Sequence, residues 1–284
     1  MKPFSLNIRG RLLEYKQPAV MGIINITPDS FFAGSRARTD EAIAARAVAL
    51  VEQGADILDI GAYSSRPGAD DVPVDEECRR LKQALGVIRS AVGSEIPISI
   101  DTFRAEVAEK CIGEWGADIV NDISGGSLDQ KMFETVAQLR CPYILMHMRG
   151  TPATMQSLTE YNDVTADVIA ELSRLLWQLD ELGVSDVIVD PGFGFAKTLE
   201  QNYQMMRDLK AFEILNRPIL VGVSRKSMIT KLLGITADEA ATPTAILGVL
   251  ALERGAAILR VHDVAEARQS ISLLKALGNV LFWN

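Results

Sequence analysis

The feature of this sequence that most limits its fold is an alternation, repeated eight times, of short Val/Ile-rich runs with longer stretches of helical periodicity. The apolar runs are residues 20–25, 56–61, 97–101, 118–122, 143–148, 186–190, 218–224 and 257–263. Such alternation predicts parallel strands joined by crossover helices. Eight strand-then-helix units within 284 residues favour a single α/β domain, a closed (β/α)8 TIM barrel over residues 18–284, rather than an open doubly wound sheet.

A short hairpin is expected before the first unit, in residues 1–17. The run SLNIRGRLLEY turns at Arg9-Gly10, a pair suited to a tight turn between two short strands. We expect this hairpin to cover the bottom of the barrel.

Composition excludes several classes of protein. Hydrophobic residues make up 48% of the chain and charged residues 23%, which is typical of a globular protein with a large core. The net charge of −8 argues against nucleic acid or an anionic membrane as a partner, because such surfaces need clustered Lys and Arg. No apolar run approaches the roughly 20 residues that span a bilayer. The N-terminal residues lack the continuous apolar core of a signal peptide, and we expect a cytoplasmic enzyme.

The three cysteines, Cys78, Cys111 and Cys141, match no zinc or redox spacing. We expect them to be small buried hydrophobic residues.

Nearly every expected strand ends in a polar residue that can bind or carry charge. These residues are Asn25, Asp59, Asp101, Asn121, His147, Asp190, Ser224 with Lys226, and Arg260 with His262. In a parallel barrel the ends of the strands converge on one face, where such folds carry their chemistry. The set therefore forms a candidate active site.

The last two of these loops suggest an anion. SRKS follows the seventh strand and RVH the eighth, and loops at these places in barrels often bind phosphate. The alternative is that Arg225, Lys226 and Arg260 pair with acids at the barrel rim. Taken together with His262, they favour an oxyanion ligand.

Asp101, Asn121 and Asp190 suit a flat heterocycle, since a carboxylate can accept two parallel bonds from an amidine-like edge. The alternative is that these residues cap helices or pair with neighbouring cations. The two histidines could bind a metal, act as bases or only form hydrogen bonds. His147 lies in an apolar run, where a structural, hydrogen-bonded role is favoured.

Seven ordered motifs resemble those of the dihydropteroate synthase family. They are NITPDSF (25–31), SSRPG (64–68), SIDT (99–102), VNDISGG (120–126), DPGFGFAK (190–197), SRKS (224–227) and RVHDV (260–264). The resemblance covers roughly residues 18 to 275. It implies a folate-pathway transferase that joins 6-hydroxymethyl-7,8-dihydropterin pyrophosphate to para-aminobenzoate, with Mg²⁺ bound.

The resemblance also implies roles for individual residues. Asp101, Asn121, Asp190 and Lys226 hold the pterin; Asn25, Arg66, Arg260 and His262 hold the pyrophosphate, with Asn25 on the metal. Catalysis rests on Lys226, Arg260, His262 and Arg66. Ser227 receives the carboxylate of para-aminobenzoate, with Phe195 and the loop of Ser65 and Pro67 beside its ring.

Three departures from the family pattern lie in two loops. Tyr63 stands where many members have Glu, Ser65 where they have Thr, and Ala33 where they have Asp. The changes at Ala33 and Tyr63 leave open a catalytically silent pterin-binding paralogue. A separate alternative is a pterin-dependent methyltransferase barrel, which would share the pocket of Asp101, Asn121 and Asp190 but needs no pyrophosphate site. We also expect a homodimer, since the closing run ALGNVLFWN is apolar.

Overall fold

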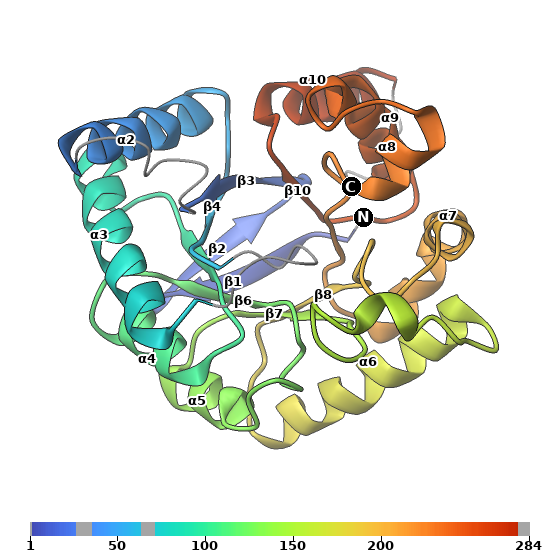
Figure 1. The fold of residues 1–284 in the computed structure, drawn as a ribbon, viewed down its shortest axis with the longest axis horizontal. Helices are drawn as coiled ribbons and strands as arrows, with labels where there is room; N and C mark the ends of the chain where they lie inside the picture. The colour runs from blue at the N-terminus through green and yellow to red at the C-terminus, as the bar shows by residue number, and fades with distance from the viewer. Residues whose placement is uncertain (1, 27–35, 64–71, 278–284) are drawn as a thin grey trace.

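The computed structural model describes residues 2–26, 36–63 and 72–277, except for the side chains of 36–38. Eight parallel strands form its centre (Figure 1). They are β3 Ala19–Asn25, β4 Ile57–Gly61, β5 Ile98–Asp101, β6 Ile119–Asp122, β7 Tyr143–Met146, β8 Val187–Asp190, β9 Leu220–Val221 and β10 Ile258–Val261. Their order is β8-β7-β6-β5-β4-β3-β10-β9, and an isolated bridge between Val189 and Ile219 joins the two ends. The predicted barrel is confirmed.

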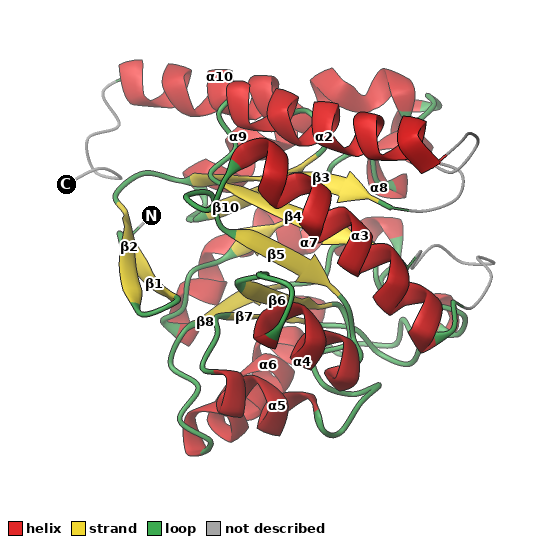
Figure 2. Cartoon of the chain, turned by 90° about the vertical axis from the view of Figure 1, so that its left-hand side faces the viewer, coloured by secondary structure: helices red, strands yellow, loops and turns green. Residues whose placement is uncertain are grey.

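Helices surround the barrel as an outer layer (Figures 1 and 2). They are α2 Arg36–Glu52, α3 Val74–Val92, α4 Ala105–Gly113, α5 Met132–Leu139, α6 Val164–Glu181, α7 Leu199–Arg207, α8 Ser227–Leu233, α9 Ala241–Glu253 and α10 Val264–Ala276, with 3-10 turns at Met155–Ser157, Leu209–Leu215 and Asp238–Ala240. No single helix of these described segments has the length and apolar character to cross a membrane, although the bent pair Ser227–Leu233 and Asp238–Glu253, at 96°, meets that measure by length and composition.

One predicted strand, residues 218–224, is much shorter in the structure. Only Leu220–Val221 pairs as a strand, because the chain then turns: the amide of Lys226 donates to the carbonyl of Val223, and Arg225 adopts a left-handed conformation with φ of 56°. The other strands begin and end within two residues of the predicted bounds.

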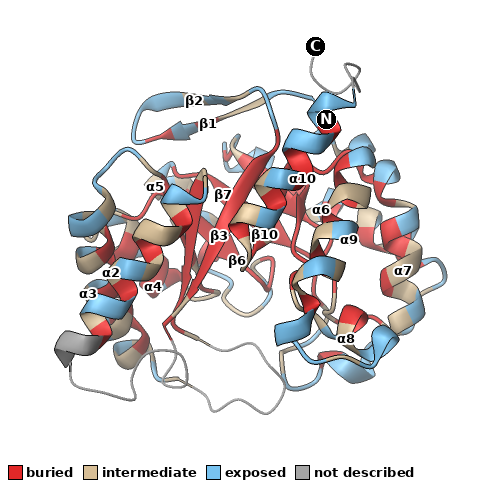
Figure 3. Ribbon diagram, turned by 90° about the horizontal axis from the view of Figure 1, so that it is seen from above, coloured by how far each residue is buried: buried red, intermediate tan, exposed pale blue. Residues whose placement is uncertain are grey.

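The barrel strands are mostly buried (Figure 3). Their side chains alternate between two separate apolar clusters, one outside and one inside the barrel. In β4, for example, Leu58 and Ile60 pack in the outer cluster, which includes helix residues, whereas Ile57 belongs to the cluster inside the barrel. Cys78, Cys111 and Cys141 are free and buried, as expected, and burial raises the pKa of each thiol.

The N-terminal hairpin closes the end of the barrel where the strands begin (Figure 2). It consists of β1 Phe4–Ile8 and β2 Arg11–Tyr15, joined through Arg9 and Gly10 with φ of 51° and 79°. Leu6 and Ile8 pack onto the first inward residues of the barrel strands, such as Ile119 and Ile188. Both the predicted turn and the predicted plug are confirmed.

Candidate active site

A polar layer lies above the apolar layer inside the barrel, and strand alternation creates it. On four strands, the residue two positions after an inward isoleucine is polar and also faces inward. The isoleucines are Ile57, Ile119, Ile188 and Ile258, and the polar residues that follow them are Asp59, Asn121, Asp190 and Arg260, in the same order. On β5 the same alternation puts Ser99 and Asp101 opposite the outward Ile98 and Ile100. The structure thus brings together five of the polar strand ends at one end of the barrel.

Arg260 lies at the centre of this layer, between two carboxylates. Its Nε and Nη2 are 2.7 and 2.6 Å from Oδ2 of Asp59, and Nη2 is also 2.7 Å from Oδ2 of Asp101. Asp59 is fully buried, and the amide Nδ2 of Asn121 donates to the same Oδ2 at 3.2 Å. This contact orients the amide of Asn121, so that its oxygen is the end that can accept a bond from a ligand.

Asp101 and Asp190 are the acceptors that this layer offers to a ligand. Burial raises the pKa of Asp101 to about 7, against the opposing charge of Arg260. Burial also raises the pKa of Asp190, against the charge of Lys226, while Oδ1 of Asp190 accepts from the amide of Gly192 at 2.7 Å. Two carboxylates at different places around one pocket can recognise an edge rich in N–H donors.

Lys226 reaches the pocket from the turn between β9 and α8. Its Nζ donates to the carbonyl of Phe193 at 2.6 Å and lies 4.7 Å from the centre of the Phe195 ring. Burial lowers its pKa to about 8, against the attraction of Asp190. Ser227, the first residue of α8, is exposed directly beside it.

His262 is tied to Ser224, so the ends of β10 and the turn after β9 meet. Nδ1 of His262 is 3.0 Å from Oγ of Ser224, which also accepts the backbone amide of His262 at 3.1 Å. Burial, followed by the charge of Arg260, lowers the pKa of His262 to about 4. The ring is therefore neutral near pH 7 and acts through hydrogen bonds.

Arg225 fits the rim alternative considered for the basic residues. It pairs with Asp263 through Nε at 3.0 Å and Nη2 at 2.7 Å, and Nη1 is 3.3 Å from Asp238. These contacts brace the turn that presents Lys226 and direct this guanidinium away from ligand binding.

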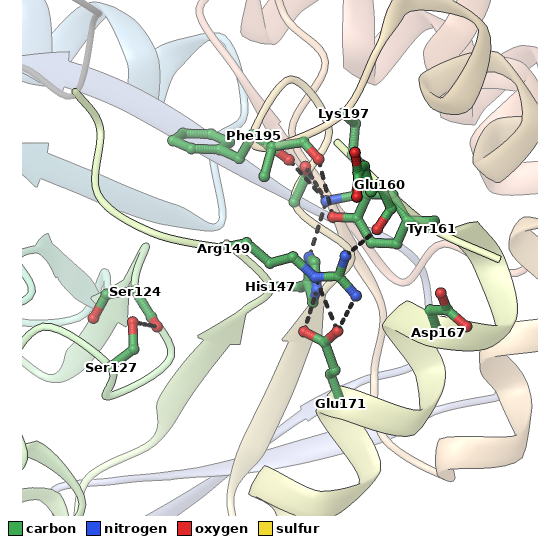
Figure 4. Close-up of polar contacts among 12 residues, drawn as sticks. Ser124, Ser127, His147, Arg149, Glu160, Tyr161, Asp167, Glu171, Phe195 and Lys197 are labelled. Carbon is green, nitrogen blue, oxygen red and sulfur yellow. Dashed lines mark hydrogen bonds and ion pairs between the residues drawn. The ribbon is translucent and has the colours of Figure 1, made fainter. Parts of the chain in front are cut away.

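His147 faces outward, away from the polar layer. Met146 pairs with inward-facing Asp190 in the β7–β8 ladder, and the next residue along an extended chain points to the opposite side. Its Nε2 is 2.9 Å from Oε2 of Glu171 on α6, and its Nδ1 is 3.0 Å from Nζ of Lys197 (Figure 4). This geometry agrees with the structural, hydrogen-bonded role favoured from the sequence.

Several predicted residues lie outside the described part of the chain: Ser65, Arg66 and Pro67 of one loop and Ala33 of another. Tyr63 is described. Its ring meets Phe103 edge-on at 5.0 Å, and the guanidinium of Arg104 lies 5.3 Å from its centre. The residue that replaces the family Glu therefore has aromatic and cationic neighbours.

For a metal, the described segments contain no group of three or more His, Cys, Asp or Glu side chains that could hold an ion. Asn25, half-buried at the end of β3, supplies one amide oxygen. A carbonyl oxygen is a donor that suits Mg²⁺, and Mg²⁺ commonly keeps several waters and binds substrate phosphate. The residues present therefore fit Mg²⁺ brought in with a phosphorylated ligand.

Asp59 was assigned no site role from the sequence, although it was among the polar strand ends. Its signal was its position, two residues after an inward Ile57 on a strand buried on both faces. The structure assigns it the task of orienting both Arg260 and Asn121.

Comparison with known proteins places this geometry in context. Residues 21–262 match the family model described as "Pterin binding enzyme". A curated dihydropteroate synthase of Synechocystis is 42% identical over 265 residues, covering 92% of this chain and 91% of the relative. That of Escherichia coli is 38% identical over 270 residues, covering 94% of each.

Solved structures of dihydropteroate synthases have the same fold as this chain. Dihydropteroate synthase of Xanthomonas albilineans with 4-aminobenzoic acid superposes with a TM-score of 0.88 at 37% identity, covering 96% of this chain and 98% of that one. The same enzyme in complex with 7,8-dihydropteroate gives a TM-score of 0.85 at 34% identity, covering 97% and 99%.

Proposed function

This chain belongs to the dihydropteroate synthase family of pterin-binding enzymes, and on that premise we propose how its residues divide the work of the transferase reaction in folate synthesis. The substrates are 6-hydroxymethyl-7,8-dihydropterin pyrophosphate and para-aminobenzoate. The C–O bond to pyrophosphate breaks, a C–N bond to the aryl amine forms, and the amine loses a proton to give 7,8-dihydropteroate. The observation that carries the proposal is the polar layer, in which acceptors for a heterocycle adjoin one half-buried guanidinium.

The pterin ring binds to the acceptors of the polar layer. Asp101, Asp190 and the amide oxygen of Asn121 accept from its N–H groups, and Lys226 donates to its ring acceptors. Because the pterin stabilises the carbon left by departing pyrophosphate, no covalent protein nucleophile is needed.

The leaving pyrophosphate binds to the cationic side of the layer. Arg260 supplies fixed positive charge, already oriented by Asp59, and neutral His262 supplies a hydrogen bond. Arg66 is assigned to the same group from the family pattern alone. Mg²⁺, held by Asn25 and the pyrophosphate, would offset charge on the leaving group when bound.

Para-aminobenzoate binds beside Lys226. The exposed hydroxyl of Ser227 meets its carboxylate, and the half-buried ring of Phe195 lies against the aryl ring. Ser65 completes this region in the family pattern.

Two alternatives make different demands on the site. A pterin-dependent methyltransferase barrel would use the pterin acceptors without a pyrophosphate site, and the placement of Arg260 and His262 argues against it. A silent paralogue would bind pterin without turnover because of changes such as Tyr63 and Ala33.

The predicted homodimer is supported by exposed Ile246 on α9 and exposed Leu273 and Leu277 at the end of α10. The cytoplasmic location stays a prediction.

The deciding measurement is pyrophosphate release by the purified protein given dihydropterin pyrophosphate, with and without para-aminobenzoate and Mg²⁺. Release that depends on all three is the expected result. Tight pterin binding without release would identify the silent paralogue, and absence of pterin binding would overturn the site assignment.

A further inference from the structure

Lys197 is a buried amine that the reaction described above does not use, and burial lowers its pKa to about 7. It lies in the loop of residues 191–198 between β8 and α7, and its side chain contacts three acceptors (Figure 4). Nζ is 3.0 Å from the carbonyl of Gly192, 2.9 Å from that of Phe195 and 3.0 Å from Nδ1 of His147. An ammonium group has three N–H donors, so this arrangement uses all of them.

The contact with His147 requires one particular tautomer of the ring. Nε2 of His147 is 2.9 Å from a carboxylate oxygen of Glu171, which can only accept, so Nε2 carries the hydrogen. Burial lowers the pKa of His147 to about 4, which leaves the ring neutral. Nδ1 is therefore an acceptor and faces the ammonium of Lys197. Glu171 thus fixes the tautomer in which Nδ1 of His147 accepts a hydrogen bond from Lys197.

Glu171 is itself fixed by Arg149. The guanidinium donates to Oε1 of Glu171 through Nε at 3.0 Å and also through Nη2, and it lies 3.9 Å from the centre of the Tyr161 ring. The hydroxyl of Tyr161 donates to the carbonyl of Ala196 at 2.9 Å. The network begins and ends on the loop that contains Lys197.

This loop contacts the candidate active site through two of its residues. The carbonyl of Phe193 accepts Nζ of Lys226, and the ring of Phe195 lies under the same Nζ. The carbonyl of Phe195 is one of the three acceptors of Lys197. Without Lys197, two backbone carbonyls and a ring nitrogen would be left buried without this donor, which favours a rearranged loop.

We propose that Lys197, oriented by His147 and Glu171, is a positioning residue for the second substrate: it fixes the loop that presents Phe195 to the aryl amine. The pterin acceptors depend less on it. Asp101 and Asn121 lie on other strands, and Asp190 is held in the β7–β8 ladder. The inference rests on the proposed function, because it assigns Phe195 to the para-aminobenzoate region.

The test compares Lys197→Met with wild type in the pyrophosphate-release assay, varying each substrate in turn. We expect KM for para-aminobenzoate to rise about tenfold or more, and KM for the pterin substrate to change by less than about threefold, since loss of a charged donor to buried acceptors is costly only locally. Glu171→Gln, which keeps Lys197 but no longer forces the tautomer, should shift the same KM in the same direction by less. Lys210→Met, at an exposed position of the Leu209–Leu215 turn, is the matched control and should leave both KM values unchanged.

A lowered melting temperature with equal changes in both KM values would mean a merely structural role and would overturn the proposal. A rise confined to the pterin KM would also overturn it and would point to an electrostatic effect of Lys197 on Asp190. If Lys197→Met does not fold, Glu171→Gln decides by the same comparison. Failure of the proposed function looks different: wild type itself then releases no pyrophosphate.

Discussion

At the residue scale, the pocket depends on one guanidinium held by two carboxylates of unequal importance. Asp59 is fully buried and contacts both Nε and Nη2 of Arg260, whereas Asp101 contacts Nη2 alone and its side chain is 22% exposed. Removing the two acids should therefore have different effects. We expect Asp101 to act mainly in binding the ligand and Asp59 to act mainly in orienting Arg260.

Asp101→Asn should separate the two halves of the first substrate. The amide loses one acceptor for the pterin N–H edge, so affinity for 6-hydroxymethylpterin should fall on the order of a hundredfold. Asp59 still orients Arg260, so affinity for Mg²⁺-pyrophosphate should change by less than about threefold. Calorimetry with each ligand measures both. Equal losses would show that pterin and pyrophosphate are not held by separate groups.

Arg260→Ala should reduce stability as well as turnover. The substitution leaves Asp59 buried without its cation, and breaking such a pair costs about 3 kcal/mol of unfolding free energy. Urea unfolding measures this loss. Arg217→Ala is the control, because its pair with Asp180 is half-exposed and should contribute little. Unchanged stability in Arg260→Ala would show that the pair with Asp59 makes no net contribution to the free energy of unfolding.

At the element scale, the loop of residues 191–198 after β8 packs directly against the backbone at the end of β7. Gly192 has φ of 74°, and a Cβ built on it would collide with the backbone carbonyl oxygen of His147. Gly183 has nearly the same φ, 77°, and open space around it. The two glycines therefore separate the cost of a left-handed conformation from the cost of a clash.

Gly192→Ala should destabilise the protein by about 3 kcal/mol or more, and Gly183→Ala by roughly 1 kcal/mol. Thermal and urea unfolding of the two variants give the difference. Gly192→Ala should also raise KM for para-aminobenzoate, since it moves the loop that carries Phe195. Similar stabilities for the two variants would show that the loop can move away from His147 without loss.

The number and order of the strands could be predicted, because the periodicities and the turn at Arg9-Gly10 are local properties. The helices could be predicted less fully, since two of them, α8 and α9, follow β9 where one is expected. The extent of β9 could not, since the turn after Val221 depends on Thr244, whose Oγ1 accepts from the amide of Arg225. Neither could the pairing of Asp59 with Arg260, which are 201 residues apart. His147 and Met146 are both buried in an apolar run, so the sequence does not show which of them faces inward.

At the scale of the whole molecule, the hairpin and the polar layer lie at opposite ends of the barrel interior. Leu6→Ala should therefore reduce stability by about 3 kcal/mol, because it leaves a cavity in the inner cluster, without changing either KM. Leu12→Ala, 64% exposed on the same hairpin, should change stability by less than about 0.5 kcal/mol. Urea unfolding and the release assay test both. A changed KM in Leu6→Ala would show that the plug and the site are coupled through the barrel.

The closure of the barrel is uneven, and this has a mechanical consequence. β3 and β4 pair through five residues each and β7 and β8 through four, but β8 meets the run before β9 through the single bridge of Val189 with Ile219. A closed sheet under force opens first between the two strands that share the fewest bridges. We expect a force that stretches the barrel to separate β8 from the run before β9 first, so that Asp190 and Lys226 move apart and pterin binding is lost while most of the sheet is still intact.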